Sequence, residues 1–313
     1  MSSLLARRAR LERAFLLSPV LLLLALVVAV PALRVLLLGF TRTELADGVV
    51  TSWAGLATHA RTLGDGRFLS ALRNTALFTF LSVLLEVTLG TALALLLDRS
   101  FRGRGALRAV VLVPWALPTS VMALAWAWIF HDTFGMANDL LLRLGLIAAP
   151  VAWLAQPGTA MAALVVADAW KTTPFVALIL LAGLQGIPRE VIEAARVDGA
   201  GAFARFRRIT LPLLVPSLVV ATLFRSIQAW GAFDVVWVMT GGGPGGSTET
   251  LALYAYQSWF RYLDFGYGAA IAVQGMLVAL LLAAPACRPG GDAAPGRPAV
   301  LRMLVPANER PFW

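Results

Sequence analysis

The stretch Glu193–Pro212, EAARVDGAGAFARFRRITLP, is a polar interruption in a mostly apolar chain. It holds four arginines, two phenylalanines and two glycines. The 313-residue chain as a whole is 59% hydrophobic and 14% charged, whereas a typical soluble domain has about 25% charged residues. This composition predicts a membrane protein, so the stretch is expected to form a loop between two membrane spans.

Six apolar segments meet or approach the roughly 20 residues that a helix needs to cross a hydrocarbon core. They are Phe15–Leu33, Ala76–Leu97, Ala109–Phe130, Thr159–Gly186, Leu211–Met239 and Tyr267–Ala284. The sequence therefore predicts an all-α membrane protein with six transmembrane helices. We expect residues 1–14 to be a cytoplasmic N-terminus, residues 15–285 the membrane domain, and residues 286–313 a disordered cytoplasmic tail rich in Pro and Gly.

The basic residues predict the orientation, because cytoplasmic loops of membrane proteins carry an excess of Lys and Arg. Placing the N-terminus inside puts 17 of the 26 basic residues in cytoplasmic segments. Both termini are therefore predicted inside, with the loop 188–212 also facing the cytoplasm. A cleaved signal peptide fits the first apolar segment less well, because its run is longer than a signal core and no A-x-A site follows it.

Local patterns within the loop 188–212 predict two short helices. Pro188 suits the first turn of a helix, and Gly199 suits its end through a positive φ. A second helix is expected to carry Phe203 and Phe206 on one face before the next span begins. An aromatic face ringed by charge is typical of a protein docking site, but a basic amphipathic segment also suits a lipid surface. Periodicity alone leaves both interpretations open.

The spacing within the loop resembles that of a known family. The pattern E-A-A-x3-G-x9-I-x-L-P is met by Glu193, Ala194, Ala195, Gly199, Ile209, Leu211 and Pro212. It resembles the EAA loop of the permease subunits of binding-protein-dependent ABC importers. The segments DAWKTTPFVALILLAGLQGIP and TGGGPGGSTETLALYAYQSWF further resemble sugar permeases of the maltose, trehalose and glycerol-phosphate group.

This resemblance implies a type I ABC importer fold in a bacterial or archaeal inner membrane, with the chain as the first of two permeases for a di- or oligosaccharide. The implied partners are a second permease, an ATPase dimer that binds ATP and Mg, and an extracytoplasmic binding protein. The loop would act as a coupling helix. The residues expected to contact the ATPase are Glu193, Ala194, Ala195 and Gly199, with Phe203 and Phe206 added from the aromatic pattern.

The sequence contains no sign of an ATPase or of another enzyme. It lacks the phosphate-loop pattern G-x-x-x-x-G-K-[ST], and its one lysine, Lys171, lies inside a predicted span. The glycine-rich segment Gly241–Gly246 has no such lysine and is expected in an outside loop near the docked binding protein. The two histidines, His59 and His131, also fall in outside loops and form no H-E-x-x-H motif. We therefore expect no catalytic residue, bound cofactor or metal.

Charged residues inside the predicted spans are open to two interpretations. Asp168 and Lys171 are three residues apart, as are Arg225 and Gln228, so each pair can share one helix face. They could form an interhelical network or line the sugar pathway. Because sugars bind to aromatic faces and polar groups, the candidate pathway residues are Trp170, Arg225, Gln228 and Trp230.

The alternative function is proton-coupled secondary transport. Glu86, Asp168 and Asp234 are intramembrane carboxylates that suit a proton relay. Such transporters more often have repeated halves and broken helices at related positions. We find no convincing repeat, and the EAA loop would have no role in that mechanism.

Overall fold

A computed structural model describes residues 15–45 and 49–284 of the chain. Within these residues, five helices are long and apolar enough to cross a membrane. They are the N-terminal helix Phe15–Leu38, which includes η1 (Ala25–Ala29) and α2 (Val30–Leu38), then α4 (Gly66–Asp98), α8 (Pro157–Gln185), the helix Ala202–Trp230 and α14 (Phe265–Ala283). A bent pair, α5 (Arg104–Ala116) and α6 (Thr119–Ile129), supplies a sixth span. The predicted tail 286–313 and N-terminus 1–14 lie outside the described residues.

Helix α8 is the central helix of the bundle. Two thirds of its most apolar window is buried, a larger share than in the other candidate spans. It packs closely against α4, where Gly90 leaves room for Val176. A Cβ on Gly90 would lie 2.6 Å from Val176 Cγ1. The contact surface of α4 and α8 therefore depends on a residue without a side chain.

The third span is broken, which corrects the prediction of one continuous helix over Ala109–Phe130. Helix α5 ends at Ala116, and α6 starts at Thr119 after a bend of 91°. Leu117 and Pro118 between them are extended. Proline disfavours the helical conformation of the residue before it and has no N–H for a helical hydrogen bond, so Pro118 accounts for the break.

The fifth span also differs from the predicted Leu211–Met239. The helix begins earlier, as α10 (Ala202–Arg205), and passes through a π-helical turn, η2 (Phe206–Thr210), into α11 (Leu211–Trp230). The predicted second loop helix is therefore the first turn of the span itself. At the other end α11 stops at Gly231, and a separate short helix, α12 (Asp234–Met239), follows.

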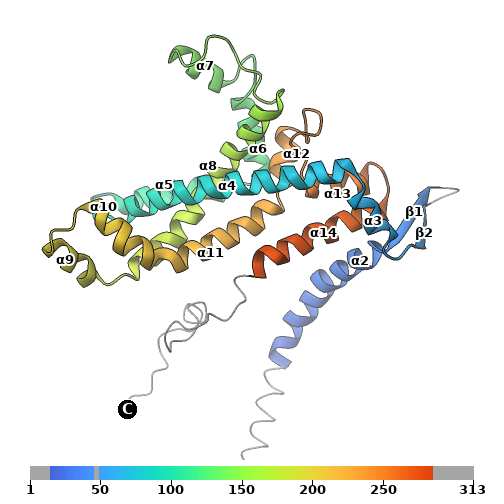
Figure 1. Ribbon diagram of the computed structural model, residues 1–313, viewed down its shortest axis with the longest axis horizontal. Coiled ribbons are helices and arrows are strands. Elements are labelled where there is room, and N and C mark those ends of the chain that lie inside the picture. Colours follow the sequence, from blue (N-terminus) through green and yellow to red (C-terminus); the bar gives the residue numbers. More distant parts are fainter. Residues whose placement is uncertain (1–14, 46–48, 285–313) are drawn as a thin grey trace, which may run out of the picture.

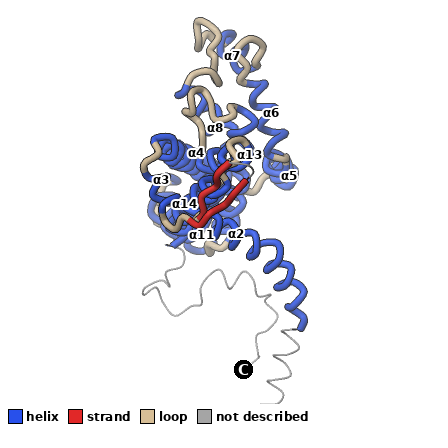
Figure 2. The backbone as a smooth tube through the Cα atoms, turned by 90° about the vertical axis from the view of Figure 1, so that its right-hand side faces the viewer, coloured by secondary structure: helices blue, strands red, loops and turns tan. Residues whose placement is uncertain are grey.

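Two sets of elements lie at opposite ends of the molecule, and we name these the coupling end and the outer end (Figure 1). Helices α9 (Arg189–Val197) and α10 occupy one end, whereas the hairpin of β1 (Thr41–Leu45) and β2 (Val49–Trp53) and the short helix α3 (Ala57–Leu63) lie at the other. Thr41 pairs with Trp53 in this antiparallel hairpin, which lies at the end of the bundle that faces the viewer in Figure 2.

Two further short helices lie in the outer loops. Helix α7 (Met136–Arg143) lies in the segment between the third and fourth spans. Helix α13 (Leu251–Phe260) follows the glycine-rich segment, and its Thr250 N-cap accepts a hydrogen bond from the Leu253 N–H. The segments between the spans therefore contain short helices of their own.

We expect Gly90→Val to weaken the packing of α4 on α8. The added side chain meets Val176 below normal contact distance, and overpacking of this kind costs about 1–3 kcal/mol. Unfolding of the purified protein in mixed micelles measures the loss. Gly105→Ala is the matched control, because Gly105 is helical and has no atom within 4 Å of an added Cβ. An equal effect of both substitutions would contradict the close approach.

Candidate coupling loop, intramembrane charge cluster and outer pocket

The end of α9 has the geometry that the sequence predicts. Gly199 has a φ of 77°, in the left-handed region that glycine adopts readily. Its N–H donates to the Arg196 carbonyl at 3.0 Å, and the Ala200 N–H donates to the Ala195 carbonyl at 3.0 Å. This pair of bonds is a Schellman motif, which satisfies carbonyls that the helix leaves free. The prediction that Gly199 ends the helix is confirmed.

The exposed surface of the loop contains four of the six residues expected to contact an ATPase. They are Glu193, Ala194, Gly199 and Phe203, the last with 74% of its surface exposed. Ala195 is buried and Phe206 is half-buried, so these two support the surface from within. Val197, which the sequence analysis did not single out, is 88% exposed. Exposed apolar side chains beside a charged one make this face suited to a protein partner.

Short connections hold the coupling loop to the spans. Only three residues separate the end of α8 at Gln185 from the start of α9 at Arg189. Helices α8 and α11 touch at Gly183, where a Cβ would lie 2.2 Å from Ser217 Oγ. The buried side chains of Leu184 and Leu214 join α8 and α11 to α4 and α5 in one apolar cluster. A force on α9 therefore acts directly on a packed body of helices.

An ion-pair cluster lies in the middle of the bundle. Arg225 on α11 is 3% exposed and binds the fully buried Glu86 on α4 through two bonds, Nε to Oε2 at 2.5 Å and Nη2 to Oε1 at 2.8 Å. Its Nη2 also donates to Asp168 Oδ2 on α8 at 2.9 Å. One guanidinium thus joins carboxylates from two other helices.

Two neutral side chains complete this charge cluster. The Thr172 hydroxyl donates to Glu86 Oε1 at 2.7 Å, and Gln228 Oε1 accepts from Arg225 Nη1 at 2.8 Å. Buried charges are stable only when their remaining hydrogen-bonding groups also find partners. The structure therefore supports the interpretation of these intramembrane charges as an interhelical network. The spacing along single helices could not identify Glu86 as the residue that completes it.

Lys171 lies beside the break in the third span. Its Nζ donates to Thr119 Oγ1 at 2.6 Å, and Thr119 is the first residue of α6. Lys171 and Asp168 come from the same helix, but no direct ion pair between them is found in the described part of the chain. The lysine instead links α8 to the helix that follows the bend.

The four candidate pathway residues occupy different environments. Arg225 and Trp230 are buried, and the Trp230 Nε1–H donates to the Gly275 carbonyl at 2.9 Å. Trp170 is 43% exposed and packs edge-on against Trp126, and Gln228 is exposed. Trp170 and Gln228 are therefore the two of the four whose side chains are exposed in this structure.

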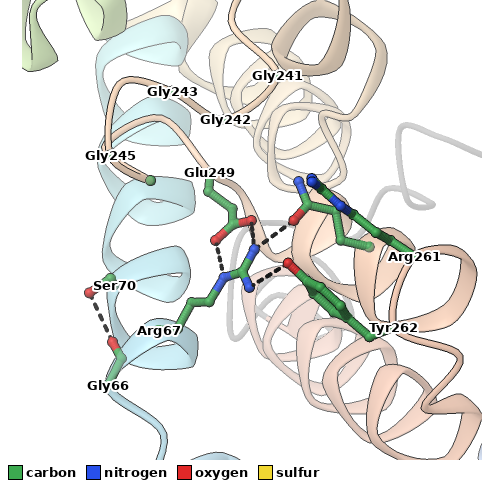
Figure 3. A pocket seen from close by; sticks show the side chains of 12 residues that line it. Gly66, Arg67, Ser70, Gly241, Gly242, Gly243, Gly245, Glu249, Arg261 and Tyr262 are labelled. Carbon is green, nitrogen blue, oxygen red and sulfur yellow. Dashed lines mark hydrogen bonds and ion pairs between the residues drawn. The ribbon is translucent and has the colours of Figure 1, made fainter.

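A pocket of about 520 Å³ lies at the outer end, between the start of α4, the segment Gly241–Gly246 and α13 (Figure 3). Arg67 occupies its wall. Its Nε and Nη2 donate to both carboxylate oxygens of Glu249, at 2.8 and 2.7 Å. Further bonds go from Nη2 to Gln257 Oε1 at 2.6 Å and from Nη1 to the Tyr262 hydroxyl at 3.0 Å. Arg67 therefore fixes α4 to the segment after the glycines.

A second polar contact next to the pocket joins α4 to α13 and α14. Asp65 Oδ2 accepts hydrogen bonds from the hydroxyls of Tyr254 and Tyr267, each at 2.5 Å. Burial alone would raise the pKa of Asp65, but these bonds and one from the Arg67 N–H outweigh it, so the pKa lies below its ordinary value. Burial and the bond to Asp65 raise the pKa of Tyr254. The carboxylate is thus held in its charged form.

Comparison with known proteins gives the family. Residues 86–286, which contain the coupling loop and the whole charge cluster, match the family described as binding-protein-dependent transport system inner membrane component. The chain belongs to this family. It is therefore a membrane component of a transport system, and the family gives no support to proton-coupled secondary transport.

Relatives and solved structures agree with this assignment. The sulfoquinovosyl glycerol transport system permease protein SmoG of Agrobacterium fabrum is 44% identical over 84% of this chain and 85% of its own length. The trehalose/maltose transport system permease protein MalF of Thermococcus litoralis is 45% identical over 73% of this chain and 76% of its own length. A chain of a bacterial ABC transporter that imports the acidic polysaccharide alginate has the same fold, with a TM-score of 0.76 at 22% identity, over 90% of this chain and 94% of that chain.

We expect Arg225→Gln to destabilise the protein strongly. The substitution leaves the Glu86 and Asp168 carboxylates buried without a cation, and breaking a buried ion pair in this way costs about 3–5 kcal/mol. The double variant Glu86→Gln, Arg225→Gln removes both charges of the main ion pair. Its free energy of unfolding should fall less than that of Arg225→Gln alone. Unfolding in mixed micelles is measured for four proteins: the unsubstituted chain, the single variants Arg225→Gln and Glu86→Gln, and the double variant.

Arg73→Gln is the control for this cycle. Arg73 is exposed on α4, and a surface substitution of this kind usually changes stability by about 0.5 kcal/mol or less. If the losses from the two single variants simply added in the double variant, Arg225 and Glu86 would be energetically independent and the ion-pair interpretation would be wrong.

Proposed function

We propose that this chain is one of two permease subunits of an ATP-driven importer of a di- or oligosaccharide. The names of the relatives support the sugar, because SmoG and MalF are permeases for a sugar derivative and for disaccharides. The second permease would be a different chain that forms the other half of the pathway. An extracytoplasmic binding protein would deliver the solute, as the family description requires of the system.

The exposed face of α9 is the observation that carries the coupling mechanism. Glu193, Val197 and Phe203 are exposed on the coupling loop, which lies between the spans α8 and α11. A separate ATPase subunit, which binds ATP and Mg, would receive this loop in a surface cleft. Closure of the ATPase dimer would then pull α9, and the short connection to α8 would transmit the movement to the packed helices. The chain itself would bind neither ATP nor metal.

The sugar pathway would pass the break of the third span. Irregular backbone is tolerated at membrane depth only where protein covers it or where it lines a cavity. Lys171 and Thr119 meet at this break, and the exposed Trp170 lies next to Lys171 in the sequence. An aromatic face beside polar groups suits the binding of a sugar. Trp170 and Gln228 are thus the residues that we favour for solute contact.

Gly199→Val and Glu193→Lys should uncouple the ATPase. Valine at a φ of 77° is strained by about 1–2 kcal/mol, which would turn α10 relative to α9. Reversing the charge of Glu193 would change the exposed face directly. We expect ATP hydrolysis stimulated by loaded binding protein to fall about tenfold in the reconstituted complex, as a change of 1.4 kcal/mol would produce.

Gly201→Ser provides the matched control for Gly199→Val. Gly201 has a φ of −63° at the N-cap of α10, a position that serine favours, and an added Cβ meets nothing within 4 Å. This variant should keep stimulated hydrolysis. Full stimulation in Gly199→Val and Glu193→Lys would argue against docking through α9.

Thiol labelling would test the orientation. In a background with Cys287→Ser, the variant Val197→Cys places one thiol on α9, and Leu56→Cys places one thiol at the opposite end, where Leu56 is exposed. A membrane-impermeant maleimide added to intact cells should label the thiol at position 56 and leave the one at position 197 unlabelled. The reverse pattern would place the coupling loop outside and overturn the proposed orientation.

A further inference from the structure

Several hydrogen-bond donors that line the outer pocket have no acceptor among the described residues. Arg261 lines the pocket and has no side-chain hydrogen bond or ion pair within residues 15–45 and 49–284. The Gln257 amide nitrogen and the backbone N–H groups of Gly245 and Gly246 likewise have no acceptor in this described part. Arg67 uses four of its five N–H donors and keeps one on Nη1.

The acceptors of the pocket are largely occupied. Glu249 is its one carboxylate, and both of its oxygens accept from Arg67. Gln257 Oε1 and the Tyr262 hydroxyl oxygen also accept from Arg67. Among the lining residues, Arg67 and Arg261 carry positive charge and Glu249 negative charge, so the pocket has a net charge of +1. A neutral sugar hydroxyl needs acceptors as well as donors, whereas a carboxylate needs only donors.

We propose that this pocket receives a carboxylate side chain of the extracytoplasmic binding protein, with Arg261 as its main ion-pair partner. The inference rests on the proposed function, since it needs a docked binding protein. Charge complementarity of this kind steers association and fixes the register of two surfaces. The bonds of Arg67 to Glu249 fix its side chain in the wall of the pocket. The Arg261 side chain has no such bond within the described part of the chain and can turn toward the carboxylate of the binding protein.

The place of the pocket favours a protein carboxylate over a solute. The pocket is built from the start of α4, α13 and the segments that follow α12 and α13 (Figure 3), at the end of the molecule away from α9 (Figure 1). A solute must pass between the spans, whereas this pocket lies at the start of α4, where Arg67 pairs with Glu249 across it. The glycines of the segment Gly241–Gly246 carry no side chain that would obstruct a docking surface beside the pocket.

The experiment measures binding of the importer's own binding protein to the reconstituted complex of permeases and ATPase in nanodiscs. Arg261→Gln should weaken the affinity about tenfold at low salt, as loss of one charge-assisted contact of 1.4 kcal/mol would produce. It should also flatten the dependence of affinity on NaCl. Arg261→Lys keeps the charge and should keep most of the affinity, and Arg73→Gln, at the same end of α4 but outside the pocket, should match the unsubstituted complex.

Each outcome decides the inference. An Arg261→Gln complex that is intact by size exclusion and binds the binding protein with unchanged affinity and salt dependence overturns it. If Arg261→Gln binds the binding protein with unchanged affinity but loses uptake of acidic sugars while keeping uptake of neutral sugars, the pocket is a solute site and the inference is overturned. If the unsubstituted complex neither binds the binding protein nor imports sugar, the proposed function itself fails. Weakened affinity in Arg261→Gln, kept in Arg261→Lys, supports the carboxylate contact.

Discussion

The ion pair of Arg225 with Glu86 constrains how the bundle can move. An ionised group in a membrane span costs about 2.5–3.5 kcal/mol or more to insert, so neither residue can separate from its partner cheaply. Since Asp168 shares the same guanidinium, α4, α8 and α11 are joined at one point. Helices α8 and α11 are also the two that flank the coupling loop. Motion imposed on α9 is therefore carried by three helices together rather than absorbed by sliding between them.

Two breaks in the spans separate further helices from this body. The third span breaks at Pro118, and the fifth stops at Gly231. The pieces beyond the breaks, α6 and α12, pack against each other, and buried Met122, Val235 and Val236 lie in the same apolar cluster. Broken helices supply many transporters with their substrate sites, because they free backbone groups at membrane depth. The polar contact of Lys171 with Thr119 ties the body to the first of these pieces.

Local signals in the sequence predicted local features well. The proline and glycine around α9 marked both of its ends, and the run of apolar residues located the spans. Features that depend on distant partners had no direct signal in the sequence. Glu86 lies 139 positions before Arg225, and Glu249 lies 182 positions after Arg67. The bend at Pro118 did have a local signal, because proline disfavours a helical conformation in Leu117. The span was located by its continuous apolar run, which does not show a bend.

Helix α4 connects the three sites. It begins with Arg67 at the outer pocket, carries Glu86 in its middle and ends beside the coupling end, where buried Leu97 packs with Leu184 of α8. Its 33 residues span about 50 Å at 1.5 Å per residue. Free-energy coupling between two sites on one body is reciprocal. If ATPase closure on α9 favours one arrangement of α4, a partner that binds the outer end in that arrangement must favour closure by the same factor. Under the proposed function, a loaded binding protein would therefore promote ATP binding without touching the ATPase.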